Sequence, residues 1–239
     1  MSVWVIDTET TGIDPASDRV VEFAAVPVHI AMVGDRVLGT LEEGASSLVY
    51  PGIAIPPKAS AVHHLIDEDV ENAPPLGRAI NQVLGPLWQA APDPIFVAHN
   101  ARFDRSFLHP LHDARWIDTY RCARHLMPTA PGFSNQCLRY WLKLPIPRDL
   151  PVHRALGDAV VTAHLFVRLL LDASPDELLR LSKKAVLLTH VPFGKHREEL
   201  WSSVPDSYLS WLAGQKSDDP DVRWTLKKEI ERRKSLSHA

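Results

Sequence analysis

The hydrophobic pattern of the first fifty residues is typical of β-strands. Val3–Asp7 is an apolar run that predicts a buried strand, and Thr10–Asp18 predicts a turn. The next run, Arg19–Ala31, is rich in β-branched residues and predicts a second strand. A further short strand is expected near Ser47–Tyr50, before the proline-rich segment PGIAIPP.

Farther along the chain, apolar residues recur at helical intervals between short apolar runs. The predicted helices are 75–90 (with Leu76, Ile80, Val83, Leu84 and Leu87 on one face), Ala101–His109, Thr119–Met127, Asn135–Leu144 and Ala155–Leu171. The predicted strands between them are Ile95–Ala98 and Trp116–Asp118. Ser134 is expected to cap a helix, and three prolines exclude helix from Pro145–Val152. The first predicted elements are strands, and farther along the chain strands alternate with helices. This order predicts an α/β fold, a mixed sheet flanked by helices.

The sequence predicts two domains. The strand and helix pattern described above occupies residues 1–175, and a boundary is expected near Lys183–Thr189. Residues 183–239 contain three of the seven tryptophans and a charged helix near Asp221–Lys234. We therefore expect a small, α-rich C-terminal domain that packs as a unit.

Composition excludes several classes of protein. The N-terminus has no apolar signal segment, and no run approaches the roughly 20 apolar residues of a membrane span. Cys122 and Cys137 are too few and too far apart for a disulfide framework or a CxxC motif. We expect reduced thiols in a soluble, cytoplasmic protein without a membrane partner.

Charge is unevenly distributed along the chain. The formal net charge is −3, but residues 183–239 contain 11 basic against 8 acidic residues, and the rest of the chain contains 15 against 21. An acidic body suits a carboxylate metal site. The basic tail either contacts phosphates or is an ordinary solvated surface, and charge alone does not distinguish the two.

Four acidic residues and a histidine are candidates for catalysis. Asp7 and Glu9 alternate along a strand, so their side chains lie on the same face. Asp104 lies one turn after Asn100 on a helix that starts where a buried strand ends, and Asp158 lies near the start of a long helix. His153 precedes Asp158 by five residues and is expected to belong to the loop. Carboxylates from distant segments gather at low cost only when a divalent cation neutralises them.

Taken together with their flanking residues, these positions resemble the DEDDh, or DnaQ-like, class of 3′→5′ exonucleases. The similar segments are IDTETTG, RVVEFAAV, VHHLIDEDV, FVAHNARFDRSFL and HRALGDAVVTAHLF. WIDTYRCARHLMP, FSNQCLRYWLKL and the later FGKHR and YLSWL segments are most similar to exodeoxyribonucleases of that class. The resemblance covers nearly the whole chain and implies a ribonuclease H-like fold.

The resemblance also implies a two-metal mechanism with Mg²⁺, for which Mn²⁺ can substitute. Asp7 would bridge both ions, Glu9 and Asp158 would hold the ion that activates water, and Asp104 would help to hold the other. His153 would act as the general base, because imidazole titrates near neutral pH. Oxygen ligands suit these two metals better than zinc.

The substrate-binding residues follow from the same resemblance. Thr8, Thr10, Thr11 and Gly12 would hold the terminal nucleotide, and Ile13 is either an apolar wedge against the bases or a core residue. His64 and Leu65 would line the nucleotide pocket, although His64 also suits the start of a helix. Asn100 and Phe103 flank the third acid, where Asn100 also suits a helix cap and Phe103 suits the core.

The C-terminal FGK segment departs from the pattern of this class, in which glycine and another basic residue commonly follow. Here Glu198 and Glu199 follow Arg197. Carboxylates beside Lys195 and Arg197 pair with these cations or repel phosphate. Contact with nucleic acid and packing against protein are therefore comparable expectations for this segment.

We predict an enzyme, a 3′→5′ exodeoxyribonuclease that acts on single-stranded or duplex DNA ends and releases nucleoside 5′-monophosphates. The first alternative is a 3′→5′ exoribonuclease, since sugar discrimination depends on few contacts. A non-catalytic nucleic-acid-binding module is the second, although all five catalytic positions carry the required residue types. Repair and defence against foreign DNA both use such enzymes, and homo-oligomerisation is left open.

Overall fold

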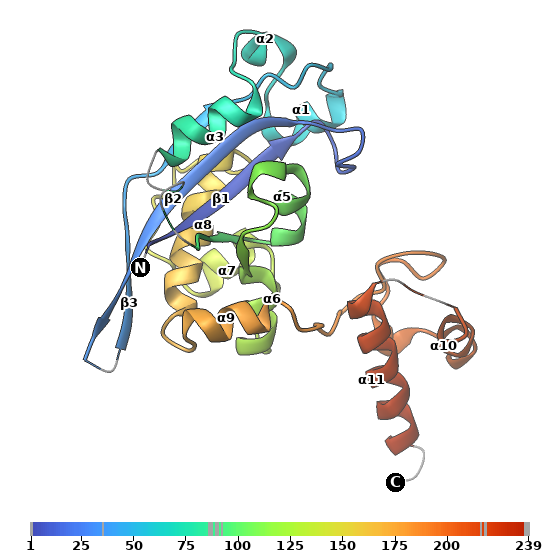
Figure 1. The fold of residues 1–239 in the computed structure, drawn as a ribbon. Coiled ribbons are helices and arrows are strands. Elements are labelled where there is room, and N and C mark those ends of the chain that lie inside the picture. The colour runs from blue at the N-terminus through green and yellow to red at the C-terminus, as the bar shows by residue number, and fades with distance from the viewer. Residues whose placement is uncertain are drawn as a thin grey trace. The chain divides into compact units, whose positions relative to one another are not determined.

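The computed structural model describes residues 2–34, 36–85, 88, 91, 93–215, 217 and 219–236. Contacts within the chain divide it into two compact units, Met1–Ser182 and Lys183–Ala239 (Figure 1). All of the residues predicted to act in catalysis lie in the first unit.

The first unit contains the sheet and the helices that flank it. Its strands are β1 (Ser2–Thr10), β2 (Val20–Val33), β3 (Arg36–Leu41), β4 (Ala45–Leu48), β5 (Ile95–Ala98) and β6 (Arg115–Asp118). Its α-helices are α1 (Pro57–His63), α2 (Asp67–Val70), α3 (Leu76–Leu84), α5 (Ala101–Phe107), α6 (Thr119–Leu126), α7 (Asn135–Trp141), α8 (Ala155–Leu169) and α9 (Pro175–Leu181). A 3₁₀-helix, His109–Leu111, follows α5.

Within the described residues the sheet has six strands in the order β3-β2-β1-β5-β6, and β4 also pairs with β2. β1 is antiparallel to β2 and parallel to β5, and β5 is parallel to β6. The predicted mixed α/β sheet is confirmed. β1 lies in the middle of it, with β2 on one side and β5 on the other (Figure 1).

Two apolar layers cover the two faces of the sheet. Val3 and Val5 pack in one cluster with α8, whereas Trp4 and Ile6 pack in another with α3 and α5. Because side chains alternate along a strand, Asp7 and Glu9 continue the face that α8 covers. The apolar start of β1 therefore anchors the strand in the core and aims its acidic end at the first turn of α8.

Several predicted boundaries differ from the structure. β1 extends to Thr10, so Asp7 and Glu9 lie inside the strand and not at its end. The helix predicted for 75–90 ends at Leu84, before Gly85 with a φ of 65°, and Leu87 lies outside the described residues. Helix α7 ends at Trp141, three residues earlier than predicted, and Lys143 follows with a positive φ.

Some elements were not predicted at all. Strand β3 and helices α1, α2 and α9 have no counterpart among the predicted elements. Helix α9 begins where the predicted catalytic domain ends, at residue 175, and its Leu178 and Leu181 are buried in the core of the first unit. The first unit therefore extends past residue 175, to Ser182.

The second unit has a core of its own. Its helices are the 3₁₀-helix Trp201–Ser203, α10 (Asp206–Ala213) and α11 (Pro220–Leu236). The buried side chains of this core are Val191, Trp201, Val204, Leu209, Leu212, Val222 and Leu226. Of its three tryptophans, Trp201 is buried, whereas Trp211 and Trp224 are exposed.

Two expectations from composition can be compared with the structure. Cys122 and Cys137 are free thiols, as predicted. In the part of the chain that the structure describes, no helix combines the length and the apolar character that crossing a membrane requires.

Candidate active site

Two carboxylates lie side by side on the central strand. Asp7 pairs with Ala24 of β2, and Glu9 pairs with Glu22. The pairing register shifts immediately after Glu9, where β1 has an irregularity. The predicted alternation of Asp7 and Glu9 therefore gives two adjacent acid groups on one face of the sheet.

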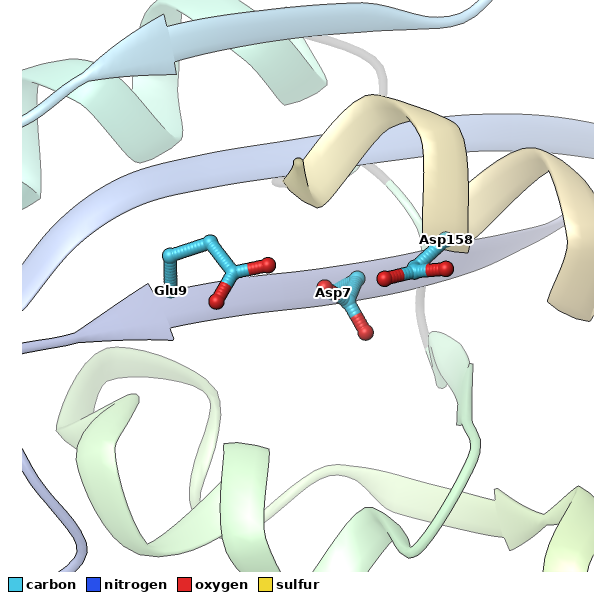
Figure 2. Close-up of side chains that lie close together, drawn as sticks. All are labelled: Asp7, Glu9 and Asp158. Atoms are coloured by element: carbon cyan, nitrogen blue, oxygen red, sulfur yellow. The ribbon is translucent and has the colours of Figure 1, made fainter. Parts of the chain in front are cut away.

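A third carboxylate reaches the same place from α8. Asp158 lies in the first turn of that helix. One carboxylate oxygen from each of Asp7, Glu9 and Asp158 lies within 4.8 Å of the other two. Figure 2 shows the three carboxyl groups gathered over β1, with Asp158 projecting from the helix. Segments 150 residues apart in the sequence thus meet at one point.

Asp104 is the fourth acid of the site. It belongs to α5, is 3% exposed, and accepts a hydrogen bond from the Thr8 hydroxyl at 2.8 Å. Thr8 is the neighbour of Asp7 on β1, so this hydrogen bond joins Asp104 to the strand that carries the first two acids. Asp104 is not part of the cluster of three.

The acid groups resist ionisation where they stand. Burial, followed by the charges of the neighbouring carboxylates, raises the pKa of Asp7 well above its usual range and that of Glu9 to about 8. Burial also raises the pKa of Asp104 to about 7 and increases that of Asp158. Such raised pKa values are expected where carboxylates are gathered without a compensating charge.

A divalent cation fits this set of donors. Three oxygen ligands lie within reach of one centre, and the fourth acid is close by. Oxygen-only coordination is the preference of hard cations. The structure thus contains an acidic site that is suited to divalent metal ions, and their positive charge would offset the repulsion among the carboxylates.

His153 lies in the loop before α8, as predicted, with a φ of 56°. Its ring nitrogen Nδ1 lies 4.0 Å from Oδ2 of Asp158, and its side chain is 59% exposed. The backbone N–H of His153 donates to the same Oδ2 at 3.0 Å. The loop therefore holds the carboxylate through its main chain and leaves the imidazole at the solvent-facing rim of the site.

Asp158 is held from a second side by a residue that the sequence did not indicate. Gln136 Nε2 donates to Oδ1 of Asp158 at 3.2 Å. Gly157 has no side chain, and a Cβ there would lie 1.9 Å from the carbonyl oxygen of Pro151. The absence of that atom lets the loop before α8 lie against the first turn of the helix.

The segment after β1 forms a compact loop around Asp18. The carboxylate of Asp18 accepts from the Thr11 hydroxyl and from the Asp14 backbone N–H. A Cβ on Gly12 would lie 2.4 Å from that carboxylate, so a side chain at position 12 would displace Asp18 from this arrangement. The Thr10 hydroxyl donates to the Gly12 carbonyl. Both threonine hydroxyls, expected as donors to a nucleotide, donate here within the loop.

The remaining predicted contact residues fall into exposed and buried groups. Ile13 is 86% exposed, so the alternative that it belongs to the core is wrong. His64 is exposed and ends α1 with a φ of 62°, so it does not start a helix. Leu65 is buried with Val21 in a small apolar cluster.

The two predicted contact residues that flank Asp104, Asn100 and Phe103, make contacts within the protein. Asn100 precedes α5 with a φ of 70°, and its backbone N–H donates to Asp118 at 3.2 Å. Its side chain makes no capping hydrogen bond. Phe103 packs on Phe107, with ring centroids 5.0 Å apart, and is partly buried against the core.

Sequence analysis also missed Glu22 and its partner Arg154, which lie near the site. Glu22 is buried, pairs in register with Glu9, and accepts two hydrogen bonds from Arg154 at 2.8 and 2.9 Å. A signal was present, because a glutamate inside an apolar, β-branched run is rarely buried without a partner. Nothing in the sequence identified Arg154 as that partner.

His63 is also buried beside the site, and its Nδ1 accepts the backbone N–H of Leu65. Burial lowers the pKa of His63, so the ring stays neutral.

Comparison with known proteins identifies the family. Residues 4–166 match the family model described as Exonuclease, which spans well over half of the chain. The chain belongs to the exonuclease family. The predicted membership is confirmed, and the fold of this exonuclease is ribonuclease H-like, as expected.

Two curated proteins are similar to this exonuclease. It is 33% identical to Exodeoxyribonuclease 10 of Escherichia coli (strain K12) over 235 residues, which cover 95% of this chain and 98% of that protein. It is 37% identical to a DNA polymerase III subunit epsilon-like protein of Rhodobacter capsulatus over 174 residues, which cover 70% of this chain and 23% of that one. The first comparison covers both chains almost from end to end.

A solved structure resembles three quarters of the chain. Exonuclease X in complex with 5′ overhanging duplex DNA matches with a TM-score of 0.60 and 30% identity, and covers 75% of this chain and 99% of that one. The predicted likeness to exodeoxyribonuclease X is confirmed by this match.

Proposed function

We propose that this protein is a metal-dependent 3′→5′ exodeoxyribonuclease that releases nucleoside 5′-monophosphates from DNA ends. The observation that carries the proposal is the meeting of Asp7, Glu9 and Asp158 within 4.8 Å, with buried Asp104 beside them. The similarity to Exodeoxyribonuclease 10 and to Exonuclease X bound to duplex DNA supports DNA as the substrate. The matched family supports the exonuclease chemistry.

The cofactor we propose is Mg²⁺, with two ions in the site and Mn²⁺ able to replace it. Support comes from the donors, which are carboxylate oxygens with raised pKa values and no thiolate among the described residues of the cluster. Bound divalent ions lower the pKa of water and stabilise charge on a leaving oxygen. Asp7 would contact both ions, Glu9 and Asp158 one of them, and Asp104 the other, through water.

His153 is proposed as the general base. Its Nδ1 faces Asp158 at 4.0 Å, so Nε2 is the nitrogen left to accept a proton from the attacking water. The exposed side chain on a loop can turn toward a bound substrate, and the backbone N–H holds Asp158 meanwhile. The same residue thus supports the metal site with its main chain and takes the proton with its ring.

The 3′ terminal nucleotide would lie over the loop that follows β1. Thr8 to Gly12 supply backbone groups at the end of the central strand, and exposed Ile13 supplies an apolar surface for a base. Asn100 and Phe103 flank Asp104, and His64 and Leu65 line the pocket from the end of α1. The exposure of Ile13 is what a wedge against stacked bases requires.

We propose further that residues 1–175 form the catalytic domain with α9 attached to it, and that residues 183–239 form a separate contact domain. The second unit supports this by its own apolar core around Trp201. Its FGK segment carries Arg197 and Glu198 as a pair, 3.6 Å apart, so its cations are partly neutralised.

A degradation assay tests the activity. We expect 5′-labelled DNA to shorten from the 3′ end with Mg²⁺ and to stay intact with EDTA. The Asp7→Ala variant should lose activity and stay folded, whereas Asp113→Ala, at a fully exposed position, should keep it. Activity that persists in Asp7→Ala would refute the site, and equal degradation of RNA would refute the preference for DNA.

A further inference from the structure

The helix that carries Asp158 obtains its N-terminal cap from another part of the chain. The residue at the cap position of α8, Arg154, makes no capping hydrogen bond with its own side chain in the described structure. The first backbone N–H groups of a helix need acceptors, because no helical carbonyl lies before them. Here Oε2 of Glu22 accepts the N–H of Ala155 at 3.0 Å. A carboxylate from β2 therefore caps this helix, in place of a Ser or Asp side chain at its own N-terminus.

The same carboxylate also holds the side chain of Arg154. Arg154 Nε donates to Oε2 at 2.9 Å, and an Nη donates to Oε1 at 2.8 Å, which gives a bidentate pair. Glu22 is 3% exposed, whereas the Arg154 side chain is 39% exposed. Bidentate guanidinium pairs fix direction as well as distance. Three hydrogen bonds thus converge on one buried carboxylate.

The position of Glu22 relates this contact to the acid cluster. Glu22 is the β2 partner of Glu9, so it lies next to the catalytic strand. Ala155 is three residues before Asp158, and Arg154 directly follows His153. A link from Glu22 to the start of α8 therefore fixes Asp158 and His153 relative to Asp7 and Glu9.

The charge of Glu22 is balanced where it lies. Glu22 adds a buried carboxylate beside acids that repel one another, and the Arg154 guanidinium, 2.8 Å from Oε1, supplies the opposite charge. The two oxygens of Glu22 accept from Arg154 and from the Ala155 amide, both at the start of α8. These contacts therefore join β2 to the helix that carries Asp158.

We propose that Glu22 is a positioning residue of the active site, which sets the third carboxylate and the general base against β1 through the Ala155 amide and Arg154. The inference rests on the proposed function for what the site does. Glu22 does not touch the substrate in this scheme. It acts on the position of α8, and Arg154 acts only through Glu22.

Four variants of the full chain separate geometry from charge. Glu22→Ala removes both contacts, Glu22→Gln keeps an acceptor oxygen without the charge, Arg154→Ala removes one contact, and the fourth combines Glu22→Ala with Arg154→Ala. The matched control is Arg168→Ala, which removes a cation of α8 from an exposed ion pair with Asp172, a residue just past the end of the helix. Circular dichroism and thermal melts establish that each variant is folded at the assay temperature.

Two readouts are used. Mn²⁺ binding without DNA is followed by electron paramagnetic resonance, and kcat and KM are measured on 5′-labelled DNA. We expect Glu22→Ala to weaken Mn²⁺ binding and lower kcat by about 10- to 100-fold, as loss of groups that orient metal ligands does. KM for DNA should change little. Arg154→Ala should show a smaller loss, and the double variant should match Glu22→Ala. Glu22→Gln keeps one acceptor oxygen but turns an NH₂ donor toward a second N–H group, so its loss should lie between those of the wild type and Glu22→Ala.

Specific outcomes would overturn the proposal. Wild-type Mn²⁺ affinity and kcat in a folded Glu22→Ala protein would show that the contact positions nothing. Tighter Mn²⁺ binding in both Glu22→Gln and Glu22→Ala would show that the charge of Glu22 opposes the site and that its contacts position nothing. Additive losses in the double variant would show that Arg154 acts separately. If the wild type binds Mn²⁺ but does not shorten DNA, the proposed function fails, and the Mn²⁺ affinities still decide the role of Glu22.

Discussion

Replacing Asp7 by asparagine should stabilise the metal-free protein at alkaline pH while abolishing its activity. The carboxyl groups of the cluster have raised pKa values in the folded state, so the folded state holds protons that the unfolded chain has released. For Glu9 the pKa is about 8 against an ordinary value of 4.5, so the folded state loses stability as the pH rises from 4.5 to 8. Asparagine removes one of the repelling charges and leaves an amide that can donate to its neighbours.

The size of the effect follows from the distance between the groups. Two unit charges 4.8 Å apart repel by about 3 kcal/mol at an effective dielectric constant of about 20. In a unit of this size each 1 kcal/mol shifts the melting temperature by about 2–4 °C. Relief of one such pair therefore predicts a rise of about 6–12 °C for Asp7→Asn at pH 8.5 in EDTA. The rise should be smaller at pH 5, where Glu9 and Asp104, with pKa values of about 8 and 7, carry protons.

Thermal unfolding at the two pH values, with EDTA and then with Mg²⁺, measures this. Asp113→Asn is the matched control, because its carboxylate is fully exposed, and it should melt like the wild type. Added Mg²⁺ should raise the melting temperature of the wild type and have a smaller effect on Asp7→Asn. An Asp7→Asn protein that melts at or below the wild-type temperature in EDTA at pH 8.5 would refute the account of the cluster as a set of repelling charges.

Three other predictions concern the metal, the loop and the core. Apparent Mg²⁺ affinity, measured by calorimetry, should rise by about 20-fold per pH unit between pH 6 and 8, because binding displaces protons from both Glu9 and Asp104, with pKa values of about 8 and 7; a flat profile would contradict this. Gly157→Ala should lower kcat and reduce the free energy of unfolding, measured in urea, by about 1–3 kcal/mol, because the new Cβ would clash with the Pro151 carbonyl. Unchanged values would mean that the loop moves freely. Phe166→Ala should reduce the free energy of unfolding by about 3–5 kcal/mol, because Phe166 is fully buried. An unchanged urea midpoint would contradict that burial.

The sequence predicted the parts of the fold that depend on local pattern. Strand β5 has the predicted bounds, Ile95–Ala98, because an apolar run between loop residues leaves little choice. Helix α8 begins at Ala155 as expected, after the proline-rich loop. Ser134 caps α7 by accepting the N–H of Cys137, as its position suggested. These features are encoded within a few residues of where they occur.

Other features depend on contacts between distant segments. Strand β3 is stabilised by pairing with the far end of β2, and α1 and α2 are short helices in a segment with several prolines. The contact between Glu22 and Arg154 joins residues 132 positions apart. A sequence pattern does not show which distant residues contact each other. The acidic residues could be grouped because they resemble a known family, but the residues that hold them in place could not be identified. The catalytic roles assigned to Asp7, Glu9, Asp104, Asp158 and His153 stay predictions.

The central location of β1 has a consequence for how the protein fails under stress. Asp7 and Glu9 are carried by a strand that pairs with β2 along its length and with β5 at Trp4 and Val5, whereas Asp158 belongs to a helix packed on the sheet. Helix ends open at lower free energy than a strand in the middle of a sheet. Mild denaturant should therefore inactivate the protein before the circular dichroism signal of its β-sheet declines. Dilution of the denaturant should restore activity quickly, because β1 stays folded and keeps Asp7 and Glu9 in place.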